Sequence, residues 1–474
     1  MCALAELMHN RGIEVSGSDL EDVFYTDEIL KELKIPFHEF FDVSHIKTPD
    51  LIVHSAAYSF ESNVEMAEAR RKGIPVLKFS DAIGAYSANF DSTGITGVHG
   101  KTTTTALSGT LLKGTGIPRN IPAKVLVGSA VSNFGGRSTI DLGDKYFIAE
   151  TCEYQRNFLS FHPKRIILTS VESDHNDFFP LYKDIRDAFF DYGRLLPPDG
   201  ELIYCADDPG ASEVALSLKE EKPGIRLVPY GFSAPGDYRI ESYQIRNERI
   251  IMRLGLFPFD LTIHVPGKHT ALNAAAAIAL VSSIVRKEFG DEGNDGWNEE
   301  RMEGLKNALE GFRGSKRRSE ILGEAGGILF MDDYAHHPTE IKTTISGLKE
   351  FYPLRRFVIS FMSHTYSRTS ALFDDFASSF TQADIAFFHK IYSSAREVYH
   401  GGLNGRSLYE RAREIEGETG DSGGRFFYTE EPDEGFCILK DILKPGDLFI
   451  TLGAGSNWSL GKKLFDYFSD GGSL

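Results

Sequence analysis

The chain has 474 residues, of which 41% are hydrophobic and 25% are charged, and its formal net charge is −17 at pH 7. A chain of this length and composition predicts a globular protein of about three domains. The acidic excess disfavours nucleic acid and anionic membranes as partners. No apolar run approaches the roughly 18 residues of a membrane span, no signal peptide is visible, and the four cysteines form no C-x-x-C motif. We therefore expect a cytoplasmic protein without a zinc site or a disulfide framework.

The first part of the chain, residues 1–88, alternates helix-like and strand-like segments. Strands are predicted within 12–20, 50–57 and 74–80, with helices between them, which is typical of a doubly wound α/β domain. The chain opens inside a helix, MCALAELMHNRG, with no strand or glycine loop ahead of it. We expect the first strand and anion-binding turn of such a domain to be missing, although a helix that simply starts the protein is the alternative.

A phosphate-binding loop is predicted within 92–112, STGITGVHGKTTTTALSGTLL. Glycines ahead of a helix let backbone N–H groups close on phosphate oxygens, and the helix dipole favours negative charge. Lys101 is expected to reach the terminal phosphates of a nucleotide, and the Thr102 or Thr103 hydroxyl to bind Mg²⁺. The loop has the short G-x-x-G-K-T form, because Ile95 stands where the longer Walker pattern has glycine. An ordinary strand-to-helix turn with a solvated Lys101 is the weaker alternative.

Two predicted strands deliver acidic residues beside this loop. The segment 145–153 ends in Glu150 and Glu153, and 164–179 runs into Glu172, Asp174 and His175. In open α/β sheets ligands bind outside the carboxyl ends of the strands. A carboxylate and a histidine at this place fit Mg²⁺ ligands or groups that hold a water molecule. Glu153 or His175 alone fits a strand-end cap or a surface position better, but together with Lys101 they favour a metal site.

Residues 224–265 change character and contain short alternating strands, which predicts a small antiparallel insert. A helix follows Gly267, and its His269 and Asn273 lie four residues apart on one face. The Asn273 amide could read a purine edge, while a helix cap plus an interior amide is an equally supported interpretation.

A third domain is predicted from Phe312, and it opens with the basic turn Lys316, Arg317 and Arg318, either solvated or a clamp for phosphates. Four strands then end in polar residues, a pattern that predicts a Rossmann-like sheet with one functional edge. These residues are Asp332, Asp333, Tyr334, His336 and His337; His364, Tyr366 and Arg368; Lys390, Tyr392, Arg396 and Glu397; and Gly453 and Gly455. The histidine pair lacks a third ligand at a fixed spacing, so a substrate contact is favoured over a metal site.

Taken in order, GVHGKTTTT, AETCEY with ESDH, PGKHTALNA, DDYAHHPTEI and HTYSRT resemble the Mur ligases of peptidoglycan synthesis over nearly the whole chain. The subgroup that joins L-alanine to UDP-N-acetylmuramate is the most similar. The resemblance implies an incomplete UDP-substrate domain at 1–88 and a central ATP-binding domain with a parallel sheet at 89–311. It also implies a C-terminal Rossmann-like domain at 312–474 that brings the amino acid. ATP, Mg²⁺ and the small-molecule substrates are the implied partners.

The resemblance also assigns roles to particular residues. In the ATP site it implies Gly97, Val98, His99, Gly100, Lys101, Thr102, Thr103, His269, Asn273 and Arg318. In the substrate site it implies His54, Ser55, Ala56, Tyr334, His336, His364 and Arg368. It implies Thr102, Glu153 and His175 as metal ligands, and Lys101, His175, Arg318, Asp332 and His336 as catalytic residues. One departure is Cys152, which stands where many relatives have Asp.

The expected reaction is acyl activation followed by amide formation. The substrate carboxylate attacks the γ-phosphorus of ATP, with Lys101, Mg²⁺ and Arg318 neutralising charge. The acyl phosphate then meets an uncharged amine, for which His336 or Asp332 is the candidate base. Two alternatives remain open: a ligase that joins a ready-made tripeptide to the same sugar nucleotide during wall recycling, and a truncated, non-catalytic nucleotide-binding remnant. The sequence predicts no oligomeric state.

Overall fold

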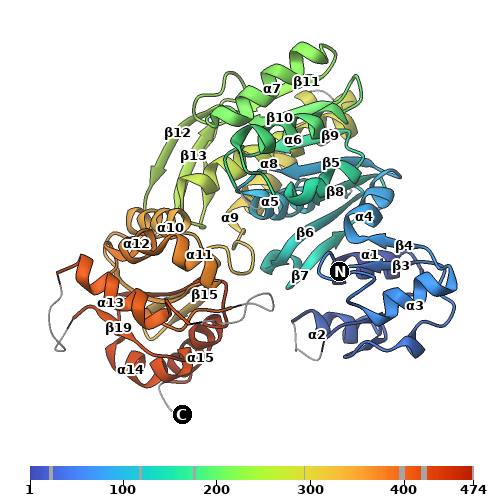
Figure 1. Ribbon diagram of the computed structural model, residues 1–474. Coiled ribbons are helices and arrows are strands. Elements are labelled where there is room, and N and C mark those ends of the chain that lie inside the picture. Colours follow the sequence, from blue (N-terminus) through green and yellow to red (C-terminus); the bar gives the residue numbers. More distant parts are fainter. Residues whose placement is uncertain are drawn as a thin grey trace. The chain divides into compact units, whose positions relative to one another are not determined.

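The computed structural model describes residues 1–20, 25–116, 120–174, 178–292, 294–393, 401–417 and 424–471. Its contacts divide the chain into two compact units. The first comprises Met1–Tyr243, Met252–Thr262 and Ala271–Phe312, and the second comprises Gln244–Ile251, Ile263–Thr270 and Arg313–Leu474. Parallel sheets with crossover helices occur in both units, so the predicted α/β fold is confirmed (Figure 1).

The N-terminal segment contains two separate pairs of parallel strands. They are β1 (Gly17–Ser18) with β2 (Phe37–His38), and β3 (Ile52–His54) with β4 (Val76–Lys78). The helical elements are α1 (Cys2–Asn10), α2 (Tyr25–Glu32), η1 (Val43–His45), α3 (Val64–Lys72) and α4 (Phe79–Ser87). Helix α1 is anchored on the central sheet, because its buried Glu6 accepts hydrogen bonds from Arg137 at 2.5 Å and from Thr139 at 2.6 Å.

The central sheet has seven strands in the order β11-β10-β9-β5-β8-β6-β7, and its neighbours are parallel except for β6 and β7. Its strands are β5 (Asp91–Thr96), β6 (Ala123–Val131), β7 (Arg137–Asp141), β8 (Tyr146–Glu150), β9 (Arg165–Leu168), β10 (Glu201–Cys205) and β11 (Arg226–Tyr230). Its helical elements are α5 (Lys101–Thr115), η2 (Ser132–Phe134), η3 (Tyr154–Ser160), α6 (Tyr182–Arg194), α7 (Pro209–Glu221), α8 (Lys268–Phe289), η4 (Gly290–Glu292), η5 (Asn294–Gly296) and α9 (Glu299–Glu310). The phosphate-loop strand β5 therefore lies at the middle of the sheet.

Both faces of this sheet are buried. Phe147 and Ala149 of β8 share one core cluster with Ala188 of α6 and Val214 of α7, while the intervening Ile148 is also fully buried. Because successive strand residues point to opposite faces, a run that is buried throughout needs cover on both sides. Figure 1 shows helices on both sides of the sheet.

Helix α8 (Lys268–Phe289) is the one helix in the described ranges that is long and apolar enough to cross a bilayer, with a mean hydropathy of 1.3. The structure buries 78% of its apolar window inside the protein. A core helix passes the same test of length and composition as a membrane span, and the burial of α8 is the pattern of a core helix.

The insert is smaller than predicted. Residues 226–230 form β11, which pairs in parallel with β10 at the edge of the central sheet, so their assignment to the insert was wrong. The strand follows helix α7 as a crossover unit, and that parallel pairing decides its sheet. The remaining strands form a three-stranded sheet of β12 (Ile240–Ile245), β13 (Ile250–Leu254) and β14 (Leu261–Ile263).

The C-terminal sheet has six strands in the order β15-β16-β20-β17-β18-β19, and only β15 runs antiparallel to its neighbour among these described strands. The strands are β15 (Glu320–Ala325), β16 (Ile328–Asp333), β17 (Arg356–Met362), β18 (Ile385–Phe388), β19 (Phe426–Tyr428) and β20 (Asp447–Gly453). The helical elements are α10 (Pro338–Phe351), α11 (Tyr366–Ala371), α12 (Phe373–Ala377), η6 (Ser378–Phe380), α13 (Gly405–Ile415), η7 (Pro432–Glu434), α14 (Gly435–Ile442) and α15 (Trp458–Ser469). The four predicted polar strand ends follow β16, β17, β18 and β20, so they meet at one edge.

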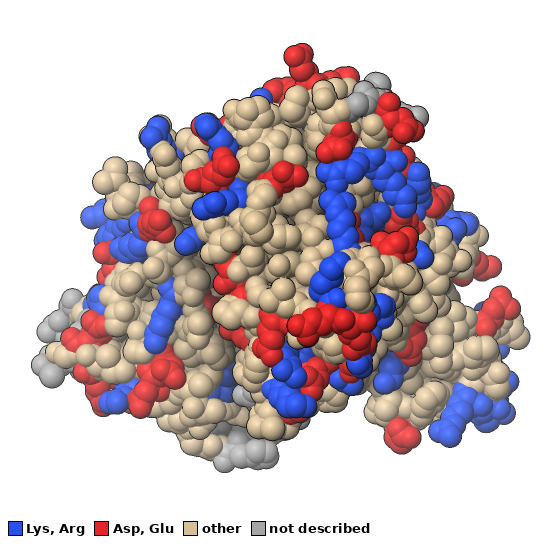
Figure 2. Space-filling view, turned by 90° about the horizontal axis from the view of Figure 1, so that it is seen from above, with Lys and Arg blue, Asp and Glu red and all other residues tan. Residues whose placement is uncertain are grey.

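The surface carries acidic and basic side chains side by side. They are interspersed on the face seen in Figure 2. Helices α6 and α7 are joined by exposed ion pairs between Arg186 and Glu213, at 2.7 Å, and between Arg194 and Glu221, at 2.6 Å. Exposed pairs of this kind contribute little, so the packed faces of the sheets stabilise the fold far more than these contacts do.

A buried histidine follows β18 and makes the stability of the protein depend on pH. His389 is 2% exposed, with Nε2 2.8 Å from Ser360 Oγ and Nδ1 2.9 Å from Thr429 Oγ1. Burial lowers the pKa of His389 to about 4. The unfolded chain, with an ordinary histidine pKa near 6.5, then binds more protons than the folded chain between about pH 4 and 6.5, so stability is lost on acidification.

Because of His389, we expect the free energy of unfolding of the wild type to fall by about 2 kcal/mol between pH 7 and pH 5. Urea unfolding of wild type and His389→Gln at both pH values measures it, since all other titrating groups are shared. The wild type should lose about 2 kcal/mol more than the variant over that range. Equal losses in the two proteins would contradict the assignment.

Candidate functional site

The phosphate loop connects the central strand β5 to helix α5, as predicted. Gly97 has φ 133° and Gly100 has φ 81°, backbone conformations that favour glycine. A Cβ at Gly97 would lie 2.1 Å from Thr169 Oγ1, and one at Gly100 would lie 2.5 Å from Asn273 Oδ1. The loop therefore packs too closely against two other segments for any larger residue at either position. It leaves the N-terminus of a 15-residue helix at the carboxyl edge of the sheet.

Lys101 begins helix α5, and its ammonium lies among oxygen atoms. It donates hydrogen bonds to the carbonyls of Gly97 at 2.5 Å and Val98 at 3.2 Å, and to both carboxylate oxygens of Glu153 at 3.0 and 3.2 Å. The Glu153 side chain is 1% exposed and that of Lys101 is 14% exposed. Burial by itself lowers the pKa of Lys101, but the carboxylates of Glu153 and Glu150 outweigh it and raise the pKa above its ordinary value. The lysine is therefore fully charged at neutral pH.

Thr102 is held by Glu150, a predicted strand-end carboxylate to which the family resemblance assigns no role. Its hydroxyl donates to Glu150 Oε1 at 3.1 Å, and Glu150 Oε2 accepts the Gly128 N–H at 2.9 Å. Glu150 is the last residue of β8 and precedes Glu153 by three residues. Its position at the carboxyl end of this strand is the sequence feature that indicates a place in the site. Two carboxylates and a hydroxyl thus lie at the start of α5, which are hard oxygen donors of the type that Mg²⁺ prefers.

The other predicted loop residues are placed as follows. His99 Nε2 pairs with Glu172 Oε1 at 3.2 Å, and its N–H donates to Ser170 Oγ at 3.0 Å. Thr103 lies in the first turn of α5. His175, predicted as a metal ligand and catalytic residue, lies outside the described residues, as do Arg396 and Glu397. Within the described ranges no three His, Cys, Asp or Glu residues gather as a metal cluster.

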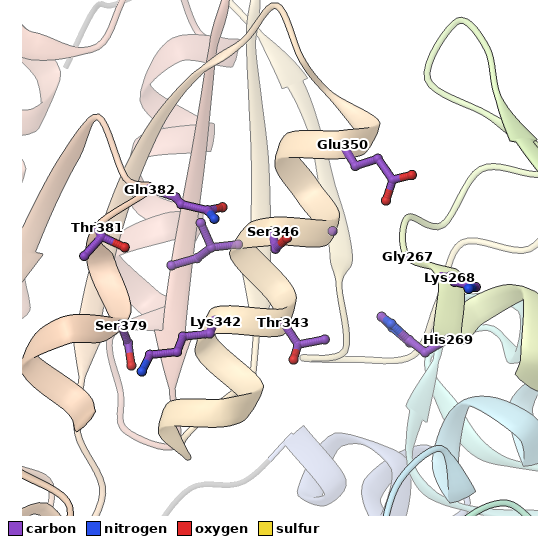
Figure 3. Close-up of a pocket in the computed structure, with 12 residues that line it drawn as sticks. Gly267, Lys268, His269, Lys342, Thr343, Ser346, Glu350, Ser379, Thr381 and Gln382 are labelled. Carbon is purple, nitrogen blue, oxygen red and sulfur yellow. The ribbon is translucent and has the colours of Figure 1, made fainter. Parts of the chain in front are cut away.

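His269 and Asn273 have different neighbours. The buried Asn273 Oδ1 accepts the Thr104 hydroxyl at 3.2 Å and lies against Gly100, so this amide supports the phosphate loop. His269 lines a pocket of about 550 Å³ together with residues of α10 and η6. In Figure 3, Thr343 and Glu350 point toward Gly267 and His269, and Lys342 extends toward Ser379. The full lining is Gly267, Lys268, His269, Lys342, Thr343, Ile345, Ser346, Gly347, Glu350, Ser379, Thr381 and Gln382.

Rings and one cation from three strand ends of the C-terminal sheet form what we call the edge cluster: Tyr334, His336, His364, Arg368 and Tyr392. The rings of Tyr334 and His336 are 5.0 Å apart, those of His336 and His364 are 5.8 Å apart, and Tyr392 stacks on His364 at 5.8 Å. Arg368 lies 3.2 Å from His364 Nδ1. All of these residues except Tyr392 belong to the predicted substrate site; Tyr392 is predicted only as a polar residue at a strand end.

His336 is the titratable centre of the edge cluster. Its Nδ1 lies 3.0 Å from the Tyr334 carbonyl and 3.5 Å from Glu340 Oε2. Burial lowers the pKa of His336, and the positive charges of Arg368 and Arg318 lower it further, while Glu340 opposes them. The imidazole is therefore neutral at pH 7 and can accept a proton.

Asp332 and Arg318, two predicted catalytic residues next to the edge cluster, differ in how their charged groups are engaged. Asp332 is 2% exposed, with Oδ2 accepting from Arg317 Nε at 2.9 Å and Oδ1 accepting the Thr451 hydroxyl at 2.5 Å. Arg318 lies with its guanidinium 5.4 Å from the centre of the Tyr334 ring. Arg318 therefore joins the edge cluster, whereas the Asp332 carboxylate is engaged beneath it.

The predicted substrate residues of the N-terminal segment, His54, Ser55 and Ala56, lie together at the carboxyl end of β3. His54 Nδ1 lies 2.8 Å from the Ser55 carbonyl, and Ser55 Oγ accepts the Ala57 N–H at 3.2 Å. These are local turn contacts, and they leave the loop at the strand edge where ligands bind in open α/β sheets.

Family models match three successive parts of the chain: "Mur ligase family, catalytic domain" at 1–91, "Mur ligase middle domain" at 95–281 and "Mur ligase, glutamate ligase domain" at 317–455. A UDP-N-acetylmuramate--L-alanine ligase from Treponema pallidum (strain Nichols) is 48% identical over 471 residues, covering 99% of this chain and 95% of that protein.

Solved structures share the fold. The UDP-N-acetylmuramate-alanine ligase MurC from Thermotoga maritima has a TM-score of 0.76 at 22% identity and covers 99% of this chain and 97% of its own. The MurF ligase from Thermotoga maritima, solved in complex with ADP, has a TM-score of 0.59 at 15% identity and covers 91% of this chain and 96% of its own. With all three family models matched and a full-length relative at 48% identity, the chain belongs to the Mur ligase family.

Proposed function

We propose that the chain joins L-alanine to the lactyl carboxylate of UDP-N-acetylmuramate with hydrolysis of ATP, through an acyl phosphate, in the cytoplasm. The observation that carries the proposal is the phosphate loop, in which Lys101 lies at the start of α5 beside two carboxylates. The edge cluster and the activity named for the 48% identical relative support the choice of amine. For the domain boundaries we propose 1–88, 89–311 and 312–474.

The residues of the loop fit a nucleoside triphosphate with Mg²⁺. Gly97 and Gly100 supply the positive φ angles that the loop needs, and the N-terminus of α5 supplies backbone donors to phosphate oxygens. Thr102 and Glu153, with His175, would hold Mg²⁺, which supplies neutralisation of phosphate charge when it is bound. Lys101, now paired with Glu153, would exchange that partner for phosphate oxygens.

In the first step the substrate carboxylate attacks the γ-phosphorus, the bond to the β,γ-bridging oxygen breaks, and ADP leaves. Lys101 and Arg318 counter the charge that spreads over the transferring group, and the protein contributes mainly position and charge. Closure of the protein around the acyl phosphate would exclude the water that otherwise hydrolyses it.

In the second step the amine attacks the acyl carbon, the tetrahedral intermediate collapses to the amide, and inorganic phosphate leaves. The amine has to lose a proton to become nucleophilic, and His336 is the neutral base that can take it. We prefer His336 to Asp332 for this role, because both carboxylate oxygens of Asp332 already accept hydrogen bonds. His364, Arg368 and Tyr334 line the same edge and would contact the substrates.

The pH dependence of kcat tests the role of His336. Protonation removes the base, so kcat should stay level from pH 8 to about 6.5 and fall only below the ordinary histidine pKa. Glu340→Gln removes the carboxylate that raises the pKa of His336, so the acid limb should move to still lower pH. His336→Gln should lower kcat by about 10²-fold and lose this limb. An acid limb of the kcat profile that is unchanged in both variants would contradict the role of His336 as the base.

Mass spectrometry of the product tests the proposed activity and separates it from its nearest rival. The chain is incubated with Mg-ATP and UDP-N-acetylmuramate, and with either L-alanine or a ready-made tripeptide. We expect the L-alanine amide and no tripeptide product. A tripeptide product alone would replace this proposal with a wall-recycling ligase, and binding of ATP without either product would indicate a non-catalytic protein.

A further inference from the structure

The two neighbouring arginines of the basic turn have different surroundings. The guanidinium of Arg317 is used within its own domain: Nε donates to Asp332 Oδ2 at 2.9 Å, and the terminal nitrogens donate to the carbonyls of Gly453 and Ala454. Both guanidiniums lie over the Tyr334 ring, at 5.2 Å for Arg317 and 5.4 Å for Arg318, but that of Arg318 has no hydrogen bond or ion pair in the described part of the chain. One arginine is fully engaged, and its neighbour is available to a ligand.

The backbone of this turn is strained and is held by the end of β16. Arg317 has φ 59° and Ser319 has φ 46°, conformations that are strained for residues with a Cβ. Three hydrogen bonds hold them: Arg317 N–H to Glu320 Oε2 at 2.8 Å, Ser319 N–H to Asp333 Oδ2 at 2.6 Å, and Tyr334 N–H to the Arg317 carbonyl at 2.7 Å. The turn and the strand end therefore form one bonded unit.

We propose that Arg317 is a positioning residue that fixes the direction of Arg318, and that Asp332 acts through Arg317 in the same way. The proposal rests on the proposed function, in which Arg318 meets the phosphate groups of ATP. Through its three acceptors Arg317 ties the turn to β16 and to the loop after β20, two segments on neighbouring strands. If those bonds are lost, the turn relaxes and Arg318 points elsewhere.

Lysine cannot replace Arg317, although it keeps the charge. A planar guanidinium reaches three acceptors in fixed directions, whereas an ammonium on a flexible stem reaches one or two. A displacement of about 1 Å in a group that stabilises a transition state can cost about 10²-fold in rate. We therefore expect Arg317→Lys to lower kcat by about 30-fold while KM for ATP changes by less than about threefold.

A double-mutant cycle of Arg317→Lys, Arg318→Ala and the combined variant tests the inference, with kcat for alanine-dependent phosphate release as the readout. If Arg317 acts through Arg318, the about 30-fold cost of Arg317→Lys should shrink to less than about threefold once Arg318 is absent. Asp332→Asn should likewise lower kcat when Arg318 is present and have a much smaller effect on kcat when Arg318 is replaced by Ala. Losses that multiply in the combined variant would overturn the proposal, because Arg317 would then act independently.

Arg356→Lys is the matched control for general destabilisation. Arg356 also makes three side-chain hydrogen bonds, two to Asp447 and one to the Ile442 carbonyl, but at the start of β17 instead of the carboxyl edge. It should lower the melting temperature as much as Arg317→Lys and leave kcat within about twofold of wild type. An equal loss of kcat would overturn the inference. If wild type itself releases no phosphate, the proposed function fails, and this inference falls with it.

Discussion

Lys101→Ala should lower kcat for ATP-dependent amide formation by at least about 10³-fold, the largest effect that we expect from any substitution in the chain. In the structure this ammonium is the cation at the start of α5, and carbonyls of the phosphate loop and the Glu153 carboxylate fix its position. Removing it leaves the attack on the γ-phosphorus without its nearest neutralising charge. Steady-state phosphate release under saturating Mg-ATP measures the loss.

Stability has to be separated from chemistry in this experiment. Removing Lys101 takes away the cation that pairs with the buried Glu153 carboxylate, so the variant should also lose stability. Lys101→Arg keeps a charge opposite Glu153, so it should retain the melting temperature and still lose about 10²-fold in kcat, because the guanidinium is a different shape. Lys113→Ala, at an exposed position in the last turn of the same helix, is the control and should match wild type. Near-normal activity of Lys101→Ala would exclude the phosphate-loop assignment.

Arg318→Ala should lower kcat by about 10²- to 10³-fold and change the melting temperature very little. The rate falls because this guanidinium counters charge on the transferring phosphoryl group. The fold is spared because, among the described residues, the half-buried Arg318 guanidinium makes no hydrogen bond or ion pair: it contacts the Tyr334 ring, and its charge acts on His336. Phosphate release and thermal unfolding on the same samples measure both quantities.

Arg413→Ala provides the matched control in the same domain. Its guanidinium lies 5.5 Å from the centre of the Tyr409 ring on α13 and donates to the Tyr409 hydroxyl at 3.3 Å, so the variant also loses an arginine–tyrosine contact. We expect a melting temperature no higher than that of Arg318→Ala, with wild-type kcat. A kcat within about threefold of wild type for Arg318→Ala would show that this arginine does not meet the nucleotide in the transition state.

The sequence was sufficient wherever a local pattern determines structure. The Gly-Lys-Thr segment after a β-branched run predicts a strand, a turn and a helix because each piece has its own short-range signature. The polar ends of β16, β17, β18 and β20 could be placed at one edge because parallel strands end together. These two local rules locate the phosphate loop and most of the edge cluster before any coordinates are known.

Contacts between distant segments could not be predicted. Arg317 and Arg318 are adjacent and identical in type, and contacts of Arg317 with Asp332 and with the Gly453 carbonyl, 136 residues away, separate their roles. The support of Thr102 by Glu150 and the burial of the Asp332 carboxylate depend on strand register in the same way. The sheet to which β11 belongs could not be predicted either. Its alternating pattern fits either sheet, and only its parallel pairing with β10 assigns it to the central sheet.

The most direct test of the central claim is inorganic phosphate release from Mg-ATP by the wild-type chain with UDP-N-acetylmuramate, measured with and without L-alanine. We expect release that depends on both the sugar nucleotide and L-alanine, with one phosphate for each amide formed. Slow release without alanine would report only hydrolysis of the acyl phosphate. The absence of any alanine-dependent release, in a sample that is folded and binds ATP, would contradict the assignment of this chain as an alanine-adding ligase.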